Sequence, residues 1–481
     1  MTACSAYTIN GRTFHNVIDN ELVSTAKTRR GTDAATGQLL NIEVPVSTQE
    51  DVDRTVDAAH AAFLKWREVS VDDRAAYIAK FADAIEANQQ EFAQLLSKET
   101  GKPPGAASIE LFISLGWVRG TLKHKLTEEV IEENEQRSVV VRYVPLGVGV
   151  GIVPWNFPIL LGLIKLASCL YAGNALIWKP SPFSPYTALK LGELGSKIFP
   201  KGVFNVLSGE EDLGPLLTGH PGVAKISFTG SVATGKKVVA ACATTLKRVS
   251  LELGGNDVAI VRSDVDIAAA VPTIASIAFM LAGQVCFAIK RVYVHESIYE
   301  EFLAAFVDFV KNLKSGGPND ADAYFGPLQN SMQHAKVLDI FGDISKNGYK
   351  VALGGEISEE SQGFFLPATI IDNPPEDSRL VTLEQFGPIV PLLKWSDEDD
   401  VVRRANASLM GLGGSVWGKD IKAAEKMTRR LEAGTVWVNS HFEIGPEAPV
   451  GGHKESGLGV ESGLEGLKGW CNMQSIFVRK T

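Results

Sequence analysis

Residues 149–153 read Gly-Val-Gly-Ile-Val and residues 175–178 read Ala-Leu-Ile-Trp, two short apolar runs typical of buried strands. Between them, residues 158–172 form a longer apolar stretch that predicts a helix. Another helix is predicted at 187–198, and a third strand follows at 203–207. Strands that alternate with helices in this way indicate a parallel sheet with crossover helices. The sequence therefore predicts a doubly wound α/β domain.

The rest of the chain extends this plan on both sides. Apolar residues at helical spacing predict three helices near the N-terminus, at 52–67, 73–87 and 89–100. A second alternating series runs from Val258 to about Trp437. Two further strand candidates, 139–145 and 475–479, belong to neither series. The C-terminal one is too isolated to pair with its neighbours, so we expect its partner to be the edge of another sheet, with a second subunit as one source of that edge.

Length and composition set broad limits. A chain of 481 residues is too long for one core and predicts two or three domains. Its 45% hydrophobic and 21% charged residues are typical of an ordinary globular protein. A net charge of −9 gives no reason to expect nucleic acid or an anionic membrane as a partner. The most apolar stretch, 157–177, is interrupted by Lys165 and by glycines, so it predicts a buried helix and strand and not a membrane span.

The cysteines and the N-terminus indicate a reducing compartment. The five cysteines are odd in number and far apart, and none lies at metal-ligand spacing from another cysteine or a histidine. We therefore expect free thiols and no metal site. Residues 1–5 lack the basic start and apolar stretch of a signal peptide, so we expect a cytoplasmic protein.

Two segments carry the residues most suited to covalent catalysis. Cys286 ends the run GQVC at 283–286, and Glu252 lies inside LELGG at 251–255. A lone cysteine can be a small buried hydrophobe, but the neighbouring glycine permits close approach of a substrate or cofactor. A thiolate can attack a carbonyl carbon. A carboxylate between two leucines has its pKa raised by desolvation, into the range of a base that activates water. We leave the other four cysteines structural.

Two more segments fit these. In PWNFP at 154–158, the Asn156 side-chain N–H and the Cys286 backbone N–H would together hold an oxyanion, although an asparagine beside proline also suits a turn. In FTGSVATG at 228–235, a strand runs into a helix at Gly230. The N-terminus of that helix can bind a pyrophosphate, with the Ser231 hydroxyl adding a contact.

At these four segments the chain resembles the aldehyde dehydrogenase superfamily, from about Gly31 to the C-terminus. The resemblance implies an α/β fold with a Rossmann-like doubly wound cofactor domain, an α/β catalytic domain and a small β oligomerisation element. It also implies a homodimer or homotetramer. The implied boundaries are 1–123 and 146–255 for the NAD(P)-binding domain, 256–455 for the catalytic domain, and 124–145 with 471–481 for the oligomerisation element.

The resemblance also implies roles for single residues. The residue that matches Glu252 hydrolyses a thioester with water, and the one that matches Lys165 relays protons behind the site. Lys179 matches the lysine at the adenosine ribose. Glu384 matches the residue at the nicotinamide ribose, with Phe386 beside the ring. For Lys165, Lys179 and Glu384, a plain surface charge is the alternative. The further cofactor contacts implied are Val153, Pro154, Trp155, Ser181, Pro182, Gly230, Ser231, Gly235, Leu253 and Gly254.

The chain departs from the family pattern in places that bear on specificity. Many NAD-preferring members carry a glutamate that accepts both adenosine ribose hydroxyls, and here that position is Pro182. The loss removes an acceptor and a charge that would repel a 2′-phosphate, which makes NADP as well as NAD a candidate cofactor. Before the nucleophile, Leu281 and Ala282 replace an asparagine-containing stretch, and Phe287 replaces a smaller residue.

The positions that match the family's substrate pocket are all apolar, and none is an arginine or lysine that could hold a carboxylate. Each of these residues could instead be plain core. The expected lining is Phe157, Leu160, Ile164, Val285, Phe287, Phe442, Ile444 and Val450.

These observations predict a non-acylating NAD(P)-dependent aldehyde dehydrogenase acting on an aromatic or medium-chain aliphatic aldehyde. The alternative is that Phe287 narrows the pocket and excludes rings. Two other functions stay open: a catalytically silent structural relative, and a thiol-dependent esterase. Retention of Cys286, Glu252 and Asn156 together argues against the silent relative. Ester turnover without any dehydrogenase activity would identify the esterase.

Overall fold

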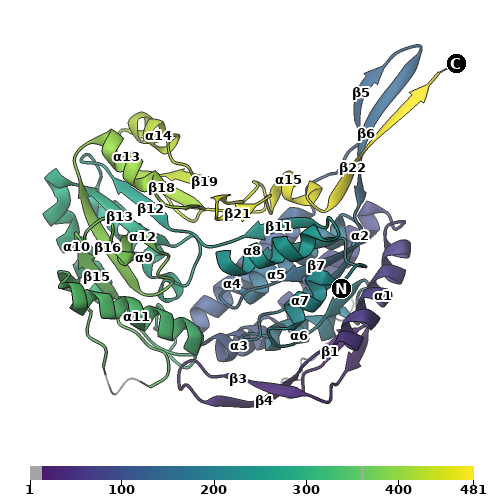
Figure 1. The fold of residues 1–481 in the computed structure, drawn as a ribbon, viewed down its shortest axis with the longest axis horizontal. Helices are drawn as coiled ribbons and strands as arrows, with labels where there is room; N and C mark the ends of the chain where they lie inside the picture. The colour runs from purple at the N-terminus through teal and green to yellow at the C-terminus, as the bar shows by residue number, and fades with distance from the viewer. Residues whose placement is uncertain (1–12, 359–361, 481) are drawn as a thin grey trace.

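An eight-stranded sheet forms the core of the first of two lobes in this computed structural model, which describes residues 13–358 and 362–480 (Figure 1). Its order is β2-β1-β9-β8-β7-β10-β11-β21. The five central strands are mutually parallel, and the edge strands β1, β2 and β21 run antiparallel to their neighbours. The bounds are β1 Asn16–Ile18, β2 Glu21–Val23, β7 Val148–Ile152, β8 Ala175–Lys179, β9 Phe204–Val206, β10 Lys225–Thr229, β11 Arg248–Glu252 and β21 Gly457–Leu458.

Helices cover both faces of this sheet, as the alternation of apolar runs predicts. α1 buries Val52, Val56 and Phe63, and its N-terminus is capped by the Thr48 side chain. α5 is buried along all its length except at Leu161, which explains its apolar sequence. The helices of this lobe are α1 Gln49–Trp66, α2 Val71–Ala87, α3 Gln89–Thr100, α4 Pro104–Thr121, α5 Pro158–Tyr171, α6 Tyr186–Gly195, α7 Leu213–Gly219 and α8 Val232–Ala243. Within the described ranges, no helix is both long and apolar enough to cross a membrane.

The second lobe contains a seven-stranded sheet in the order β14-β15-β16-β13-β12-β18-β19, parallel except for β14 at one edge. The predicted boundary near 255 separates β11 of the first sheet from β12 of this one. The strands are β12 Asp257–Val261, β13 Ile289–His295, β14 Val351–Leu353, β15 Thr369–Asp372, β16 Ile389–Trp395, β18 Gly413–Trp417 and β19 Thr435–Val438. The helices are α9 Ile267–Phe279, α10 Tyr299–Lys311, α11 Ser331–Asn347, α12 Arg379–Thr382, α13 Glu398–Asn406 and α14 Ile421–Thr428, with short 3-10 turns η1 Met280–Gly283 and η2 Glu296–Ile298.

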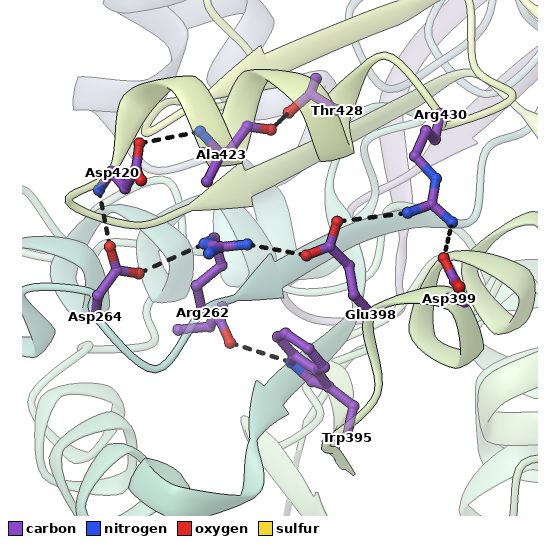
Figure 2. A network of polar contacts seen from close by, with 11 residues as sticks. Arg262, Asp264, Trp395, Glu398, Asp399, Asp420, Ala423, Thr428 and Arg430 are labelled. Atoms are coloured by element: carbon purple, nitrogen blue, oxygen red, sulfur yellow. Dashed lines mark hydrogen bonds and ion pairs between the residues drawn. The ribbon is translucent and has the colours of Figure 1, made fainter.

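A chain of charged side chains ties α13 and α14 to the carboxyl end of β12 (Figure 2). Arg262, directly after β12, pairs with Glu398 on α13, which also pairs with Arg430. Asp264 accepts a hydrogen bond from the Asp420 backbone N–H at 2.8 Å, and Asp420 caps α14. The segment with Cys286 precedes β13, so it lies at the amino end of this sheet. The charged network therefore braces the edge opposite the cavity described below.

A three-stranded antiparallel arm projects from the first lobe (Figure 1). It pairs β22 Cys471–Arg479 with β6 Arg137–Pro145, and β6 with β5 Glu129–Glu133. The C-terminal strand thus finds its partner in its own chain, with Cys471 opposite Pro145 and Arg479 opposite Arg137. The elements that remain are the hairpin β3 Thr28–Thr32 with β4 Leu39–Pro45, the pair β17 Met410–Gly411 with β20 His453–Lys454, and α15 Gly463–Lys468.

Candidate active site

A cavity of about 60 Å³ lies where the two lobes meet, with Cys286, Glu252 and Asn156 among its lining residues. That volume holds several water molecules. All eight apolar side chains expected from the sequence line it: Phe157, Leu160, Ile164, Val285, Phe287, Phe442, Ile444 and Val450. Five further lining residues were not anticipated: Trp117, Leu161, Thr229, Glu461 and Ser462. The motifs that are scattered along the sequence are therefore brought to one place.

Cys286 is presented by strained backbone. Leu281, Ala282 and Gly283 have consecutive positive φ angles of 49°, 56° and 73°. Gly283 is required here, because a Cβ at this position would collide with the Gly387 carbonyl. The cysteine itself is partly exposed, whereas Cys169, Cys242 and Cys471 are buried, and all four are free thiols. Strain of this kind in residues other than glycine is typical of functional sites.

The pKa of the Cys286 thiol is raised, chiefly by burial and then by the negative charges of Glu384, Asp257 and Glu252. The thiolate is the nucleophilic form of cysteine. A proton acceptor or a compensating positive charge is therefore needed before this thiol can attack a carbonyl.

The Asn156 side chain is fixed at both ends of its amide. Its Nδ2 donates to the Gln284 carbonyl at 3.0 Å, and its Oδ1 accepts from the Phe157 N–H at 3.0 Å. An amide nitrogen carries two hydrogens, so this geometry leaves a second donor for an oxyanion. The contact with Gln284 also ties the asparagine directly to the loop that carries the nucleophile.

Glu252 ends β11 and is buried, and its Oε1 has no hydrogen-bond partner among the described residues. Burial raises its pKa well above the usual range, Glu461 raises it further, and Lys165 opposes both. A carboxylate with this environment is a stronger proton acceptor than an exposed one. Its backbone carbonyl accepts from the Gly230 N–H at 3.0 Å, which links it to the glycine-rich turn.

Lys165 is not the exposed surface lysine that was one alternative. It is 1% exposed, and its ammonium pairs with the Glu461 carboxylate and donates to the Thr229 hydroxyl at 2.8 Å. The same carboxylate accepts from the Ser227 hydroxyl at 2.5 Å. Sequence reasoning missed Glu461, because it lies 296 positions from its lysine and its run Val-Glu-Ser-Gly carries no chemical signal.

The expected cofactor residues gather at the carboxyl ends of β7, β8 and β10, where open α/β sheets bind ligands. The Val153 N–H donates to the Lys179 carbonyl at 3.0 Å, which holds the segment Pro154 and Trp155 beside Lys179, Ser181 and Pro182. Lys179 is 6% exposed, and its ammonium has one weak hydrogen bond, to the Pro180 carbonyl at 3.3 Å. An ammonium has three donors, so this buried lysine suits the hydroxyls of a sugar.

The glycine-rich turn leads into α8 as expected. Ser231 is the N-cap of the helix, and its hydroxyl accepts from the Thr234 N–H at 3.3 Å. Gly230 precedes this cap, and Gly235 lies in the first turn, packed against Leu253. The backbone N–H groups of such a terminus suit a pyrophosphate.

Glu384 and Phe386 come from the second lobe and reach the first. The Glu384 carboxylate accepts from the Gly255 N–H at 3.0 Å, and a Cβ on Gly254 would collide with it. Phe386, with a φ of 49°, packs edge-on against Trp155 with ring centroids 5.5 Å apart. These residues therefore bridge the lobes beside the cavity. Across the part of the chain that the structure describes, no cluster of three or more His, Cys, Asp or Glu could hold a metal ion.

The fold is that of an α/β enzyme with a cavity between its two lobes. The sequence profile of the aldehyde dehydrogenase family matches residues 24–476. Aldehyde dehydrogenase LUC3 of a Fusarium species is 40% identical over 469 residues, covering 97% of this chain and 99% of the relative. The solved NAD+ complex of an aldehyde dehydrogenase from Bacillus cereus is 32% identical, with a TM-score of 0.95 and 98% of each chain covered.

A second solved structure is betaine aldehyde dehydrogenase from Staphylococcus aureus with NAD+. It is 31% identical, with a TM-score of 0.93, and the match covers 98% of this chain and 95% of that one. The chain therefore belongs to the aldehyde dehydrogenase family, and it is an aldehyde dehydrogenase. The predicted fold class is confirmed.

Proposed function

We propose that this enzyme oxidises an apolar aldehyde, aromatic or medium-chain aliphatic, to the carboxylic acid. The observation that carries the proposal is the lining of the cavity, in which no arginine or lysine occurs among the described residues. Phe287 and Phe442, with ring centroids 6.2 Å apart, and Phe157 offer faces and edges to a ring. Burial of apolar substrate area then drives binding, at about 25 cal/mol per Å².

Cys286 is the proposed nucleophile. Its thiolate sulfur forms a bond to the aldehyde carbon, and the carbonyl oxygen becomes the oxyanion of a thiohemiacetal. The Asn156 side-chain N–H and the Cys286 backbone N–H hold that oxygen. Donors of this kind stabilise such transition states by roughly 3–4 kcal/mol. The fixed amide of Asn156 supports this role, because it needs no rearrangement when charge develops.

The cofactor is NAD or NADP, which when bound would accept the hydride from the thiohemiacetal carbon and so leave a thioester on Cys286. Lys179 would hold the adenosine ribose, the turn from Gly230 to Ser231 the pyrophosphate, and Glu384 the nicotinamide ribose. The partly satisfied ammonium of Lys179 and the capped terminus of α8 fit such a ligand. Phe386 and Trp155 would exclude water from the side of the site where the ring lies.

Glu252 is the proposed base for the second half of the reaction. It takes a proton from water, the hydroxide oxygen bonds to the thioester carbon, and the Cys286 sulfur leaves as thiolate. The raised pKa of Glu252 supports this role, because its carboxylate accepts a proton from water more readily than that of an exposed glutamate. Lys165 and Glu461 lie behind it, and their ion pair offers a route for that proton.

We also propose a cytoplasmic homodimer or homotetramer joined through the arm. Large apolar side chains are exposed along it, among them Phe477 at 71% and Met473 at 66%. An unpartnered apolar surface of this kind favours association. Light scattering of the purified protein, beside a form with Phe477→Ser and Met473→Ser, measures the subunit number directly.

A panel of aldehydes assayed for NADH or NADPH formation tests the substrate proposal. We expect hexanal and benzaldehyde to have at least about tenfold higher kcat/KM than acetaldehyde, because they bury more apolar area. Succinic semialdehyde and betaine aldehyde, which carry charges, should be poor. Preference for either charged substrate would contradict the apolar pocket. Loss of hexanal activity in Phe442→Ala, with acetaldehyde activity retained, would place the substrate chain against that ring.

A further inference from the structure

Lys290 is a buried lysine, four residues after the nucleophile, to which the reaction as described gives no role. It is the second residue of β13 and is 1% exposed. Its ammonium donates to the Gly283 carbonyl and lies 5.2 Å from the centroid of the Phe386 ring. These contacts join the loop that carries Cys286 to the segment beside the proposed nicotinamide site.

The Gly283 contact acts on the strained part of the loop. Gly283 is the last of the three consecutive residues with positive φ, and its carbonyl is buried. Further contacts hold the next residue: Gln284 donates through Nε2 to the Leu281 carbonyl at 2.8 Å and accepts from the Gln329 N–H at 2.9 Å. Strained backbone persists only where the surroundings over-determine it. Among the contacts that hold this strained segment, the one from Lys290 is charged.

The charges around this lysine give it a second effect. The carboxyl groups of Glu384, Asp257 and Glu252 raise the pKa of Cys286, and His441 Nε2 lies 3.4 Å from Asp257 Oδ2. Lys336 on α11 is a second cation that acts on Lys290 and lowers its pKa. Burial lowers the pKa of Lys290 to about 8, against the opposing influence of Glu384, Asp257 and Cys286. A positive charge near a thiol favours the thiolate.

We propose that Lys290 is a positioning residue for the nucleophile: its ammonium fixes the Gly283 carbonyl, which keeps residues 281–283 in their left-handed conformation, and its charge favours the thiolate of Cys286. The proposal deepens the proposed function, in which Cys286 attacks the aldehyde. Its test uses neither aldehyde nor turnover, so the two can fail separately.

The test is the rate at which iodoacetamide alkylates Cys286 in the protein without cofactor, followed from pH 6 to 10 by mass spectrometry of the Cys286 peptide. In Lys290→Met the rate at pH 7 should fall about tenfold, and the difference from the wild type should narrow above about pH 8, where the Lys290 ammonium loses its proton. Lys290→Arg, which keeps a cation and donors, should retain the wild-type rate at pH 7. The NAD dissociation constant should change less than about threefold, since Phe386 also packs on Trp155.

Lys190→Met is the matched control. Lys190, on α6, is 2% exposed, and its ammonium lies 4.9 Å from the centroid of the Phe14 ring. It is therefore also a buried lysine over an aromatic ring, but away from the cavity. Its variant should alkylate like the wild type. A wild-type rate at pH 7 in Lys290→Met, or a difference that does not change with pH, would overturn the proposal, whatever happens to NAD binding. If Lys290→Met does not fold, a tenfold lower rate in folded Lys290→Arg would overturn it equally.

Discussion

The two lobes bring opposite kinds of backbone to one cavity. On the side of the first lobe, Glu252 and Lys165 are carried by a regular strand and a regular helix, and their partner Glu461 fixes the lysine by an ion pair. On the side of the second lobe, Cys286 follows three residues with positive φ. In the proposed mechanism, the acid–base groups thus lie on regular elements, whereas the proposed nucleophile is presented by strained backbone of the kind found at functional sites.

Of the changes that test this comparison, removal of the thiol should have the largest effect on aldehyde oxidation. We expect Cys286→Ser to reduce aldehyde oxidation on the order of 10³-fold or more, because a hydroxyl is a poor nucleophile at neutral pH. NAD binding should stay intact, since the proposed cofactor contacts lie on other segments. The measurements are absorbance at 340 nm and NAD titration by fluorescence. Cys242→Ser, a buried cysteine on α8, is the control. More than a few per cent residual activity, without contaminating wild type, would remove Cys286 from its role.

The first lobe should control a different step. Glu252→Gln is expected to lower steady-state turnover on the order of 10²-fold while the first burst of NADH survives, because the amide cannot take a proton from water. A thioester should then accumulate on Cys286. Rapid mixing followed by mass analysis of the intact protein detects that adduct. Unchanged steady-state turnover would show that another group activates the water, and the division of work between the lobes would fail.

A finer change tests the ion pair behind Glu252. Glu461 raises the pKa of Glu252 and Lys165 lowers it. Glu461→Gln removes the first influence and leaves the second unpaired, so both effects move the pKa of Glu252 downward. The rising limb of the pH profile for thioester hydrolysis, which needs Glu252 without its proton, should then shift to lower pH by about one unit. An unchanged limb would mean that Glu461 acts only through packing.

Local patterns predicted the fold and most of the residues that line the cavity, whereas contacts between residues distant in sequence were not predicted. The alternating apolar runs identified both sheets, and the four short motifs identified the thiol, the carboxylate, the amide and the glycine-rich turn. Glu461 and the in-chain pairing of the last strand with residues 137–145 depend on contacts across some three hundred positions or more. Lys290 lies close to Cys286 in sequence, but its contacts are with Gly283 and Phe386, and no spacing rule connects the three.

The smallest expected effect is on cofactor preference, and it concerns the proposed adenosine site around Lys179 in the first lobe. From the sequence, Pro182 removes an acceptor for the ribose, and no added arginine is evident that could pair with a 2′-phosphate. The structure places Arg29 close enough to Lys179 to lower its pKa, which burial brings to about 8, while Asp212 and Glu211 act in the opposite direction. Two cations, Lys179 and Arg29, would attract a phosphate at this site, and the two carboxylates would repel it.

Opposing charges of this kind predict weak preference between NAD and NADP in the natural chain. Pro182→Glu should raise the ratio of kcat/KM for NAD over NADP by about tenfold, the scale of one charged hydrogen bond. Pro182→Gln supplies an acceptor without the charge and should give a smaller change, because it cannot repel a phosphate. Both ratios are measured at saturating aldehyde. If the natural chain already strongly favours NAD and Pro182→Glu leaves the ratio unchanged, the carboxylates of Glu211 and Asp212 read the ribose in place of the missing glutamate.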